Sequence, residues 1–132
     1  MESVDNNITL IDFHAANISY NQLTVLHDVN FKVNKGEFVY LVGRVGSGKS
    51  SLLKSLYADA IITEGQARIL EYDLTTIDDD EVPYLRRKLG IVFQDFKLLT
   101  DRNVHDNLEF VLRATDMKDK MQIESRIDEV LR

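Results

Sequence analysis

The residues best suited to do chemistry lie in one short run, and that chemistry is phosphate binding. The run fits G-x-x-x-x-G-K followed by Ser or Thr at every fixed position, as Gly43-Arg44-Val45-Gly46-Ser47-Gly48-Lys49-Ser50. The glycines at positions 43, 46 and 48 are expected to adopt backbone conformations closed to other residues, so that successive N–H groups point inward at an anion. Lys49 would then reach the β- and γ-phosphates of a nucleotide, and the Ser50 hydroxyl would ligate Mg²⁺.

The elements on either side of this loop must position it. Residues 38–42 form an unbroken apolar run, Phe-Val-Tyr-Leu-Val, which predicts a strand covered on both faces. From Lys49 the residues Leu52, Leu53 and Leu56 recur at helical spacing, which predicts a helix whose N-terminal dipole faces the same anion. The alternative is a chance match in a glycine-rich turn, and the order of strand, loop and helix argues against it.

Apolar patterns predict further strands and helices along the chain. The first twenty residues read as extended, and Val25, Val29, Phe31 and Val33 lie on one side of an alternation that only His27 interrupts. We expect two more strands, at residues 65–70 and 89–93, and helices beyond Asp101. Two apolar stripes mark these helices: Leu108, Val111 and Leu112, and then Ile127, Val130 and Leu131.

Length and composition are typical of one globular domain. The 132 residues are 44% apolar and 29% charged, and the formal net charge of −6 argues against a general nucleic-acid binder, which needs Lys and Arg for phosphate contacts. The chain has no cysteine, which excludes a disulfide framework and a thiolate metal site. No secretory signal follows Met1 and no apolar stretch is long enough to span a bilayer, so we expect a partner to hold the protein at any membrane where it works.

The residues around the phosphate loop resemble those of ABC transporter ATPases. Tyr20, in Asn17-Ile18-Ser19-Tyr20, matches the aromatic residue that stacks on adenine in that family, although a plain strand aromatic is the alternative reading. Val92-Phe93-Gln94-Asp95 resembles the Q-loop, whose glutamine contacts Mg²⁺ and the attacking water. The resemblance implies catalytic roles for Lys49 and Gln94, Mg²⁺ ligation by Ser50 and Gln94, and ATP binding by a larger set: Tyr20, Gly43, Arg44, Val45, Gly46, Ser47, Gly48, Lys49, Ser50 and Ser51.

The fold that this resemblance implies is α/β. It would contain part of a P-loop NTPase core sheet, an antiparallel β subdomain from the N-terminal strands, and the start of a helical subdomain. The whole chain, residues 1–132, is expected to be the N-terminal portion of a single ABC nucleotide-binding domain. The last helix reaches Arg132 with no capping glycine or proline, which indicates a chain that stops within the domain.

A narrower resemblance points to the cell-division ATPases called FtsE. It rests on Pro83-Tyr84-Leu85-Arg86-Arg87 and Gly90-Ile91-Val92-Phe93-Gln94-Asp95, and on scattered residues between 98 and 107. It implies a head-to-tail homodimer that binds and hydrolyses Mg·ATP on the inner face of the cell membrane. That dimer would be coupled to an integral-membrane partner like FtsX that controls septal wall cleavage. Lipoprotein-releasing and macrolide-export ATPases share much of this stretch and stay open as alternatives.

Some family features depart from the pattern or are missing. Val45 stands where a small polar residue is frequent, Ser51 replaces a threonine, and Glu71-Tyr72 occupies a turn where glycine is common. The signature loop, the Walker B aspartate with its catalytic glutamate, and the switch histidine are not found in the 132 residues; the histidines at 14, 27 and 105 are read as structural or surface residues. We therefore expect nucleotide binding with little or no turnover, and a non-catalytic, self-associating chain is a further alternative.

Two further segments have two readings each. Residues 96–107 resemble the region that receives a membrane subunit's coupling helix, and a plain connecting loop is the equal alternative. The basic run Arg86-Arg87-Lys88 stands beside an acidic run, which indicates a solvated face rather than a nucleic-acid patch.

Overall fold

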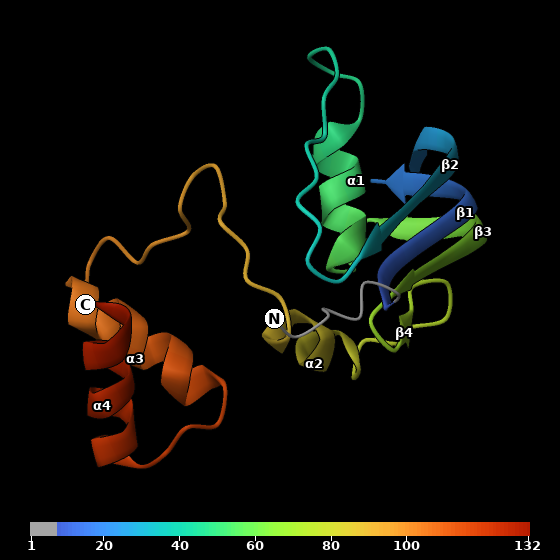
Figure 1. Ribbon diagram of the computed structural model, residues 1–132. Coiled ribbons are helices and arrows are strands. Elements are labelled where there is room, and N and C mark those ends of the chain that lie inside the picture. Colours follow the sequence, from blue (N-terminus) through green and yellow to red (C-terminus); the bar gives the residue numbers. More distant parts are fainter. Residues whose placement is uncertain (1–7) are drawn as a thin grey trace. The chain divides into compact units, whose positions relative to one another are not determined.

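The computed structural model describes residues 8–132, which form two compact units that divide between Leu89 and Gly90. The first unit contains four strands and two helices, and the second contains two helices (Figure 1). The elements are β1 Thr9–Tyr20, β2 Leu23–Asn34, α1 Lys49–Leu56, β3 Ile61–Ile69, β4 Tyr72–Asp73, α2 Val82–Arg87, α3 Val104–Ala114 and α4 Lys120–Val130.

The strands form one antiparallel sheet in the order β2-β1-β3-β4. The first two strands make a hairpin in which Phe13 lies opposite Phe31, with ring centroids 4.9 Å apart. This sheet is the antiparallel β subdomain expected from the N-terminal sequence. The predicted strand at 65–70 is confirmed as the second half of β3, and of the extended first twenty residues, positions 1–7 lie outside the described part of the chain.

A β-bulge changes which side chains of β2 face the core. Asp28 has a φ of 51° and Ala15 on the neighbouring strand a φ of 48°, and the pairing register shifts at this level of the sheet. An extra residue in one strand reverses the side on which the next side chains lie. Leu26 therefore packs against the core, whereas Val25 is exposed and its predicted place on the buried face was wrong.

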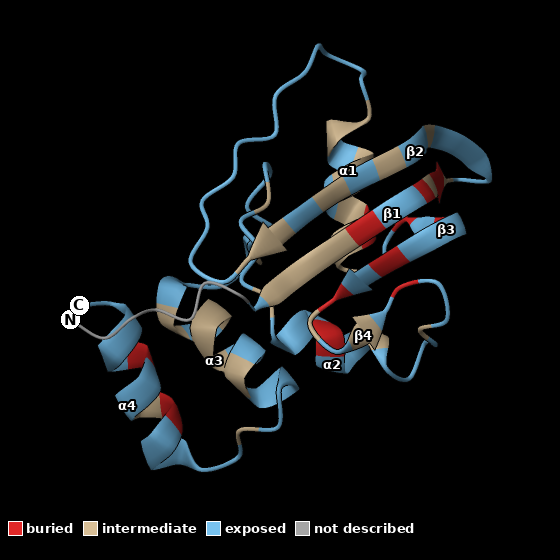
Figure 2. Ribbon diagram, turned by 45° about the vertical axis from the view of Figure 1, so that its right-hand side comes forward, coloured by how far each residue is buried: buried red, intermediate tan, exposed pale blue. Residues whose placement is uncertain are grey.

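The core of the first unit lies where α1 packs on the sheet. Fully buried residues come from the middle of β1 and β3, and Leu85 of α2 joins them (Figure 2). Leu52 and Leu56 of α1 pack against this cluster, as their helical spacing predicted, whereas Leu53 faces solvent. The sheet and α1 thus form two layers, and the start of α1 lies at the end of the phosphate loop.

The two buried strands predicted on either side of α1 were wrong. Residues 37–46 and 90–93 have no helix or strand conformation, and Phe38, Tyr40 and Val42 are 81%, 81% and 87% exposed. A strand forms only where a neighbouring strand pairs its N–H and C=O groups, and within residues 8–132 no strand pairs with either run. The apolar runs identified residues that could lie in a core sheet. They did not show which strands would pair with them.

The second unit is a pair of helices, as the two apolar stripes predicted. Ile123 and Ile127 of α4 are buried, while Val111, Val130 and Leu131 from the predicted stripes are exposed. Each helix begins at a side-chain cap: Asn103 accepts from the N–H of Asp106, and Asp119 accepts from the N–H of Gln122. None of the helices in residues 8–132 has the length and apolar character that crossing a bilayer requires.

Candidate nucleotide-binding site

The phosphate loop takes its shape from two glycines with left-handed backbone conformations. Gly46 has a φ of 78° and Gly48 a φ of 91°. Residues with a Cβ adopt such backbone angles only at a cost in free energy. Gly43 does not share this conformation, so the expectation for it was wrong. A Cβ there would lie 2.6 Å from Ser47 Oγ, a contact that rotation of the serine side chain would relieve.

The phosphate loop is followed directly by α1. The helix begins at Lys49, its N-cap is Gly48, and no side chain of the described residues accepts a hydrogen bond from its first turn. The first N–H groups of a helix lack partners within it, and they carry the positive end of the helix dipole. This end of α1 is therefore built to receive an anion, and the residue types present fit a phosphate group.

Lys49 lies inside the loop that it follows. Its ammonium donates to the carbonyl oxygens of Gly43 at 2.8 Å and Arg44 at 2.6 Å, and lies 3.5 Å from Ser47 Oγ. These contacts fold the side chain back over the loop, so a positive charge and the helix N-terminus meet at one place. Ser50 is the second residue of α1 and is exposed, and Ser51 follows it half-buried.

Tyr20 is held at the end of β1 by a tight turn. Asn21 and Gln22 have φ values of 50° and 65°, the pair of left-handed residues that a two-residue hairpin of type I′ requires. The Tyr20 ring is half-buried against the core and borders a hollow of about 550 Å³. The ammonium of Lys54 lies 3.7 Å from the centre of the ring, and the interaction with Tyr20 raises the pKa of Lys54 above its ordinary value.

Gln94 belongs to the second unit, whereas the phosphate loop and Tyr20 belong to the first. It opens an exposed turn over residues 94–97, beside the ion pair of Asp95 and Lys97 at 2.7 Å. The hydrogen bond from Lys97 lowers the pKa of Asp95, so this carboxylate stays charged at neutral pH. The role of Gln94 next to Ser50 stays a prediction.

The three histidines lie on the strands of the first unit and in the helix pair of the second. His14 and His27 are exposed on the strands, and His105 of α3 contacts Glu124 of α4 through Nε2 at 2.9 Å. That hydrogen bond raises the pKa of His105. These placements agree with the reading of the three histidines as structural or surface residues.

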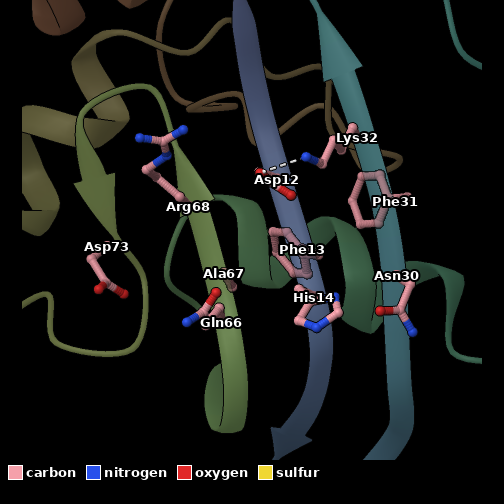
Figure 3. A pocket seen from close by; sticks show the side chains of 10 residues that line it. All are labelled: Asp12, Phe13, His14, Asn30, Phe31, Lys32, Gln66, Ala67, Arg68 and Asp73. Carbon is pink, nitrogen blue, oxygen red and sulfur yellow. Dashed lines mark ion pairs between the residues drawn. The ribbon is translucent and has the colours of Figure 1, made fainter.

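A second hollow of the first unit lies over the strands, and none of the predicted site residues lines it. It measures about 720 Å³, and Figure 3 shows its side chains projecting from the strands with α1 behind them. Asp12 and Lys32 form an ion pair of 3.3 Å there, and His14, Arg68 and Asp73 stand nearby (Figure 3). The polar residues here carry both signs of charge, as expected for a solvated sheet face.

Comparison with known proteins places this chain in one family. The ABC transporter family matches residues 26–132. The cell division ATP-binding protein FtsE of Bacillus subtilis is 41% identical over 111 residues, which cover 84% of this chain and 48% of that protein. The methionine import ATP-binding protein MetN 1 of Acinetobacter baylyi is 31% identical over 131 residues, which cover 96% of this chain and 36% of that protein. The chain thus spans about half, or less, of the length of these curated relatives.

Solved structures of ABC cassettes are similar to this chain as well. The dimeric ABC transporter cassette MJ0796 superposes with a TM-score of 0.76 at 31% identity, over 92% of this chain and 54% of that one. The same cassette in a post-hydrolysis state with ADP and Pi gives a TM-score of 0.78 at 29% identity, over 91% and 55% of the two chains. The α/β fold of an ABC cassette is therefore confirmed, with part of it represented here, and the chain belongs to the ABC transporter family.

Proposed function

We propose that this chain is the phosphate-binding portion of an ATP-binding subunit of the cell-division type. The observation that carries the proposal is the meeting of three anion-binding features at one point. These are the left-handed glycines of the loop, the uncapped N-terminus of α1, and the Lys49 ammonium within 2.8 Å of the loop carbonyls. The similarity to FtsE proteins at 38–44% identity supports the cell-division type over the more distant importers.

The residues of the site have distinct tasks in this proposal. The loop N–H groups and Lys49 hold the β- and γ-phosphates, and Tyr20 offers its ring to the adenine. Ser50 and Gln94 are the proposed ligands of Mg²⁺, which supplies charge neutralisation of the phosphates when bound. Catalysis of this kind depends on positioning and charge stabilisation, and none of these residues is a general base. We therefore expect the 132 residues by themselves to bind Mg·ATP with little or no hydrolysis.

The intact subunit would act as a dimer with two nucleotides at its interface. The dimeric form of the related cassette MJ0796 supports this part of the proposal. Through residues 96–107 the subunit would meet an integral-membrane partner like FtsX, which would keep it on the inner face of the membrane. An importer or exporter ATPase is the second candidate, favoured by the identity to MetN over nearly the whole chain. Cross-linking from residues 96–107 to a division or transport membrane subunit separates the two.

The test of nucleotide binding is calorimetry with Mg·ATP, with phosphate release followed in parallel. Lys49→Ala removes two charged hydrogen bonds and should weaken binding by at least about tenfold. Lys35→Ala makes the same charge change at an exposed turn and should leave the affinity unchanged. Equal affinities for Lys49→Ala and Lys35→Ala would refute the proposed site.

A self-associating chain without catalytic function is a third candidate, because of one specific observation. Phe38, Tyr40 and Val42 expose most of their surfaces in a contiguous apolar run. Such runs are typical of surfaces that bind a partner or aggregate. Sedimentation with and without Mg·ATP distinguishes this candidate, because association that ignores the nucleotide favours it over an ATP-dependent dimer.

A further inference from the structure

The ring of Tyr20 has a cation over it. Lys54 reaches across from α1, and its ammonium lies 3.7 Å from the ring centre, well inside the ~6 Å range of a cation–π contact. The same ammonium lies 3.8 Å from a carboxylate oxygen of Asp59, in the turn after the helix. Lys54 is half-buried, and these two contacts together restrict where its side chain can lie. No sequence motif singles out this lysine, because its ring partner lies 34 positions earlier in the chain.

We propose that Lys54 is a positioning residue for nucleotide binding, which holds the Tyr20 ring from one side so that its other face receives the purine. This inference rests on the proposed function, because it deepens the role given to Tyr20. The described contacts of the Lys54 ammonium are with the Tyr20 ring and Asp59, and none is with a side chain of the phosphate loop.

Lys49 and Lys54 lie on the same helix, so the phosphate loop and the Tyr20 ring are linked through α1. Lys54 follows Lys49 by five residues, which places it roughly 7.5 Å farther along the helix axis. The phosphates bind at the beginning of the helix, so the nucleotide approaches from that end. The inference therefore requires the purine to take the face of the Tyr20 ring that Lys54 leaves uncovered.

The size of the effect follows from the cost of ordering a side chain. Immobilising one flexible side chain on binding weakens an interaction by about twofold to tenfold. The backbone of Tyr20 is already fixed by the Asn21–Gln22 turn, so the ring itself is the part left to order. A ring held in place before the nucleotide arrives avoids that loss. Lys54→Met keeps the length and the apolar stem of the side chain but removes the charge, so it should release the ring without leaving a cavity.

The experiment is calorimetric binding of two ligands, Mg·ATP and magnesium tripolyphosphate, which has the phosphates but no base. The variants are Lys54→Met, Tyr20→Ala and the double variant, each checked for native circular dichroism. Lys32→Met is the matched control, since it also removes a lysine charge from an ion pair, in the same unit but without an aromatic ring. We expect Lys54→Met to weaken Mg·ATP by about twofold to tenfold, with unchanged tripolyphosphate binding, and to have no further effect once Tyr20 is alanine.

Each other outcome has a definite meaning. The inference is overturned if Lys54→Met leaves Mg·ATP affinity unchanged or tightens it, if it weakens both ligands equally, or if its effect adds fully to that of Tyr20→Ala. Wild-type protein that binds tripolyphosphate as tightly as Mg·ATP, with no effect of Tyr20→Ala, would overturn only this inference and leave the phosphate loop intact. Wild-type protein that binds neither ligand would overturn the proposed function itself, and the inference with it.

Discussion

Replacing Gly48 with alanine is the sharpest test of how this loop is built. Gly48 combines a left-handed conformation, φ 91°, with a close approach to another element. A Cβ at this position would lie 2.7 Å from Cδ2 and 2.8 Å from Cγ of Leu26, which itself packs against the core. Gly46 has a similar conformation, φ 78°, but a Cβ there would meet nothing within 4 Å. The two substitutions share the backbone cost and differ only in the contact with Leu26.

The magnitudes follow from that difference. Holding alanine in a left-handed conformation costs about 1–2 kcal/mol, and the reduced freedom of the unfolded chain returns about 0.4–1 kcal/mol in both variants. Gly46→Ala should therefore lower the free energy of unfolding by roughly 1 kcal/mol or less. Forcing a methyl group against Leu26 adds about 1–3 kcal/mol of overpacking. Gly48→Ala should then cost about 2–4 kcal/mol, a large share of the ~5–15 kcal/mol that is usual for a domain.

The assay is urea unfolding followed by far-ultraviolet circular dichroism, with the slope of the transition compared among variants. Adding Leu26→Ala to Gly48→Ala removes the atoms in the way, so the double variant should lose less stability than the two single effects predict together. Equal costs for Gly46→Ala and Gly48→Ala, or a fully additive cycle with Leu26→Ala, would show that this contact does not shape the loop.

Three further predictions concern the second unit. Ile127→Ala should destabilise the helix pair by about 2–5 kcal/mol, because Ile127 is only 2% exposed, and loss of helical signal on mild heating measures it. Asn107→Ala should cost about 1–3 kcal/mol, because its side chain accepts from the N–H of Leu99 at 2.8 Å and donates back to the carbonyl of Leu99 at 3.0 Å; faster hydrogen exchange of the Leu99 amide would register the loss, and unchanged exchange would contradict it. The raised pKa of His105 means that its contact with Glu124 stabilises the folded state fully below about pH 6.5 and is lost as pH rises through the folded pKa. The free energy of unfolding of the second unit, measured between about pH 5 and 8, should fall with rising pH for the wild type. It should not do so for His105→Gln.

Local features of this protein could be read from sequence because they depend on neighbours in the chain. The spacing of Gly43, Gly48 and Lys49 predicted a loop that enters a helix, and the structure has α1 beginning at Lys49. Alternation predicted the strand that corresponds to β2, and the two apolar stripes predicted the helices beyond Asp101. Backbone conformation, capping and periodicity are set within a few residues, so the pattern of side chains is enough to predict them.

Contacts between distant segments were decided only by the tertiary structure. The bulge near Asp28 exchanged Val25 for Leu26 on the buried face, since register depends on the partner strand. Residues 38–42 have the composition of a buried strand, yet without a paired neighbour they are exposed. Lys54 over Tyr20 is a contact across 34 positions that no local pattern encodes. Sequence thus determined which residues can bind phosphate, whereas long-range pairing and packing determined which neighbours hold them, because these depend on groups brought together only by folding.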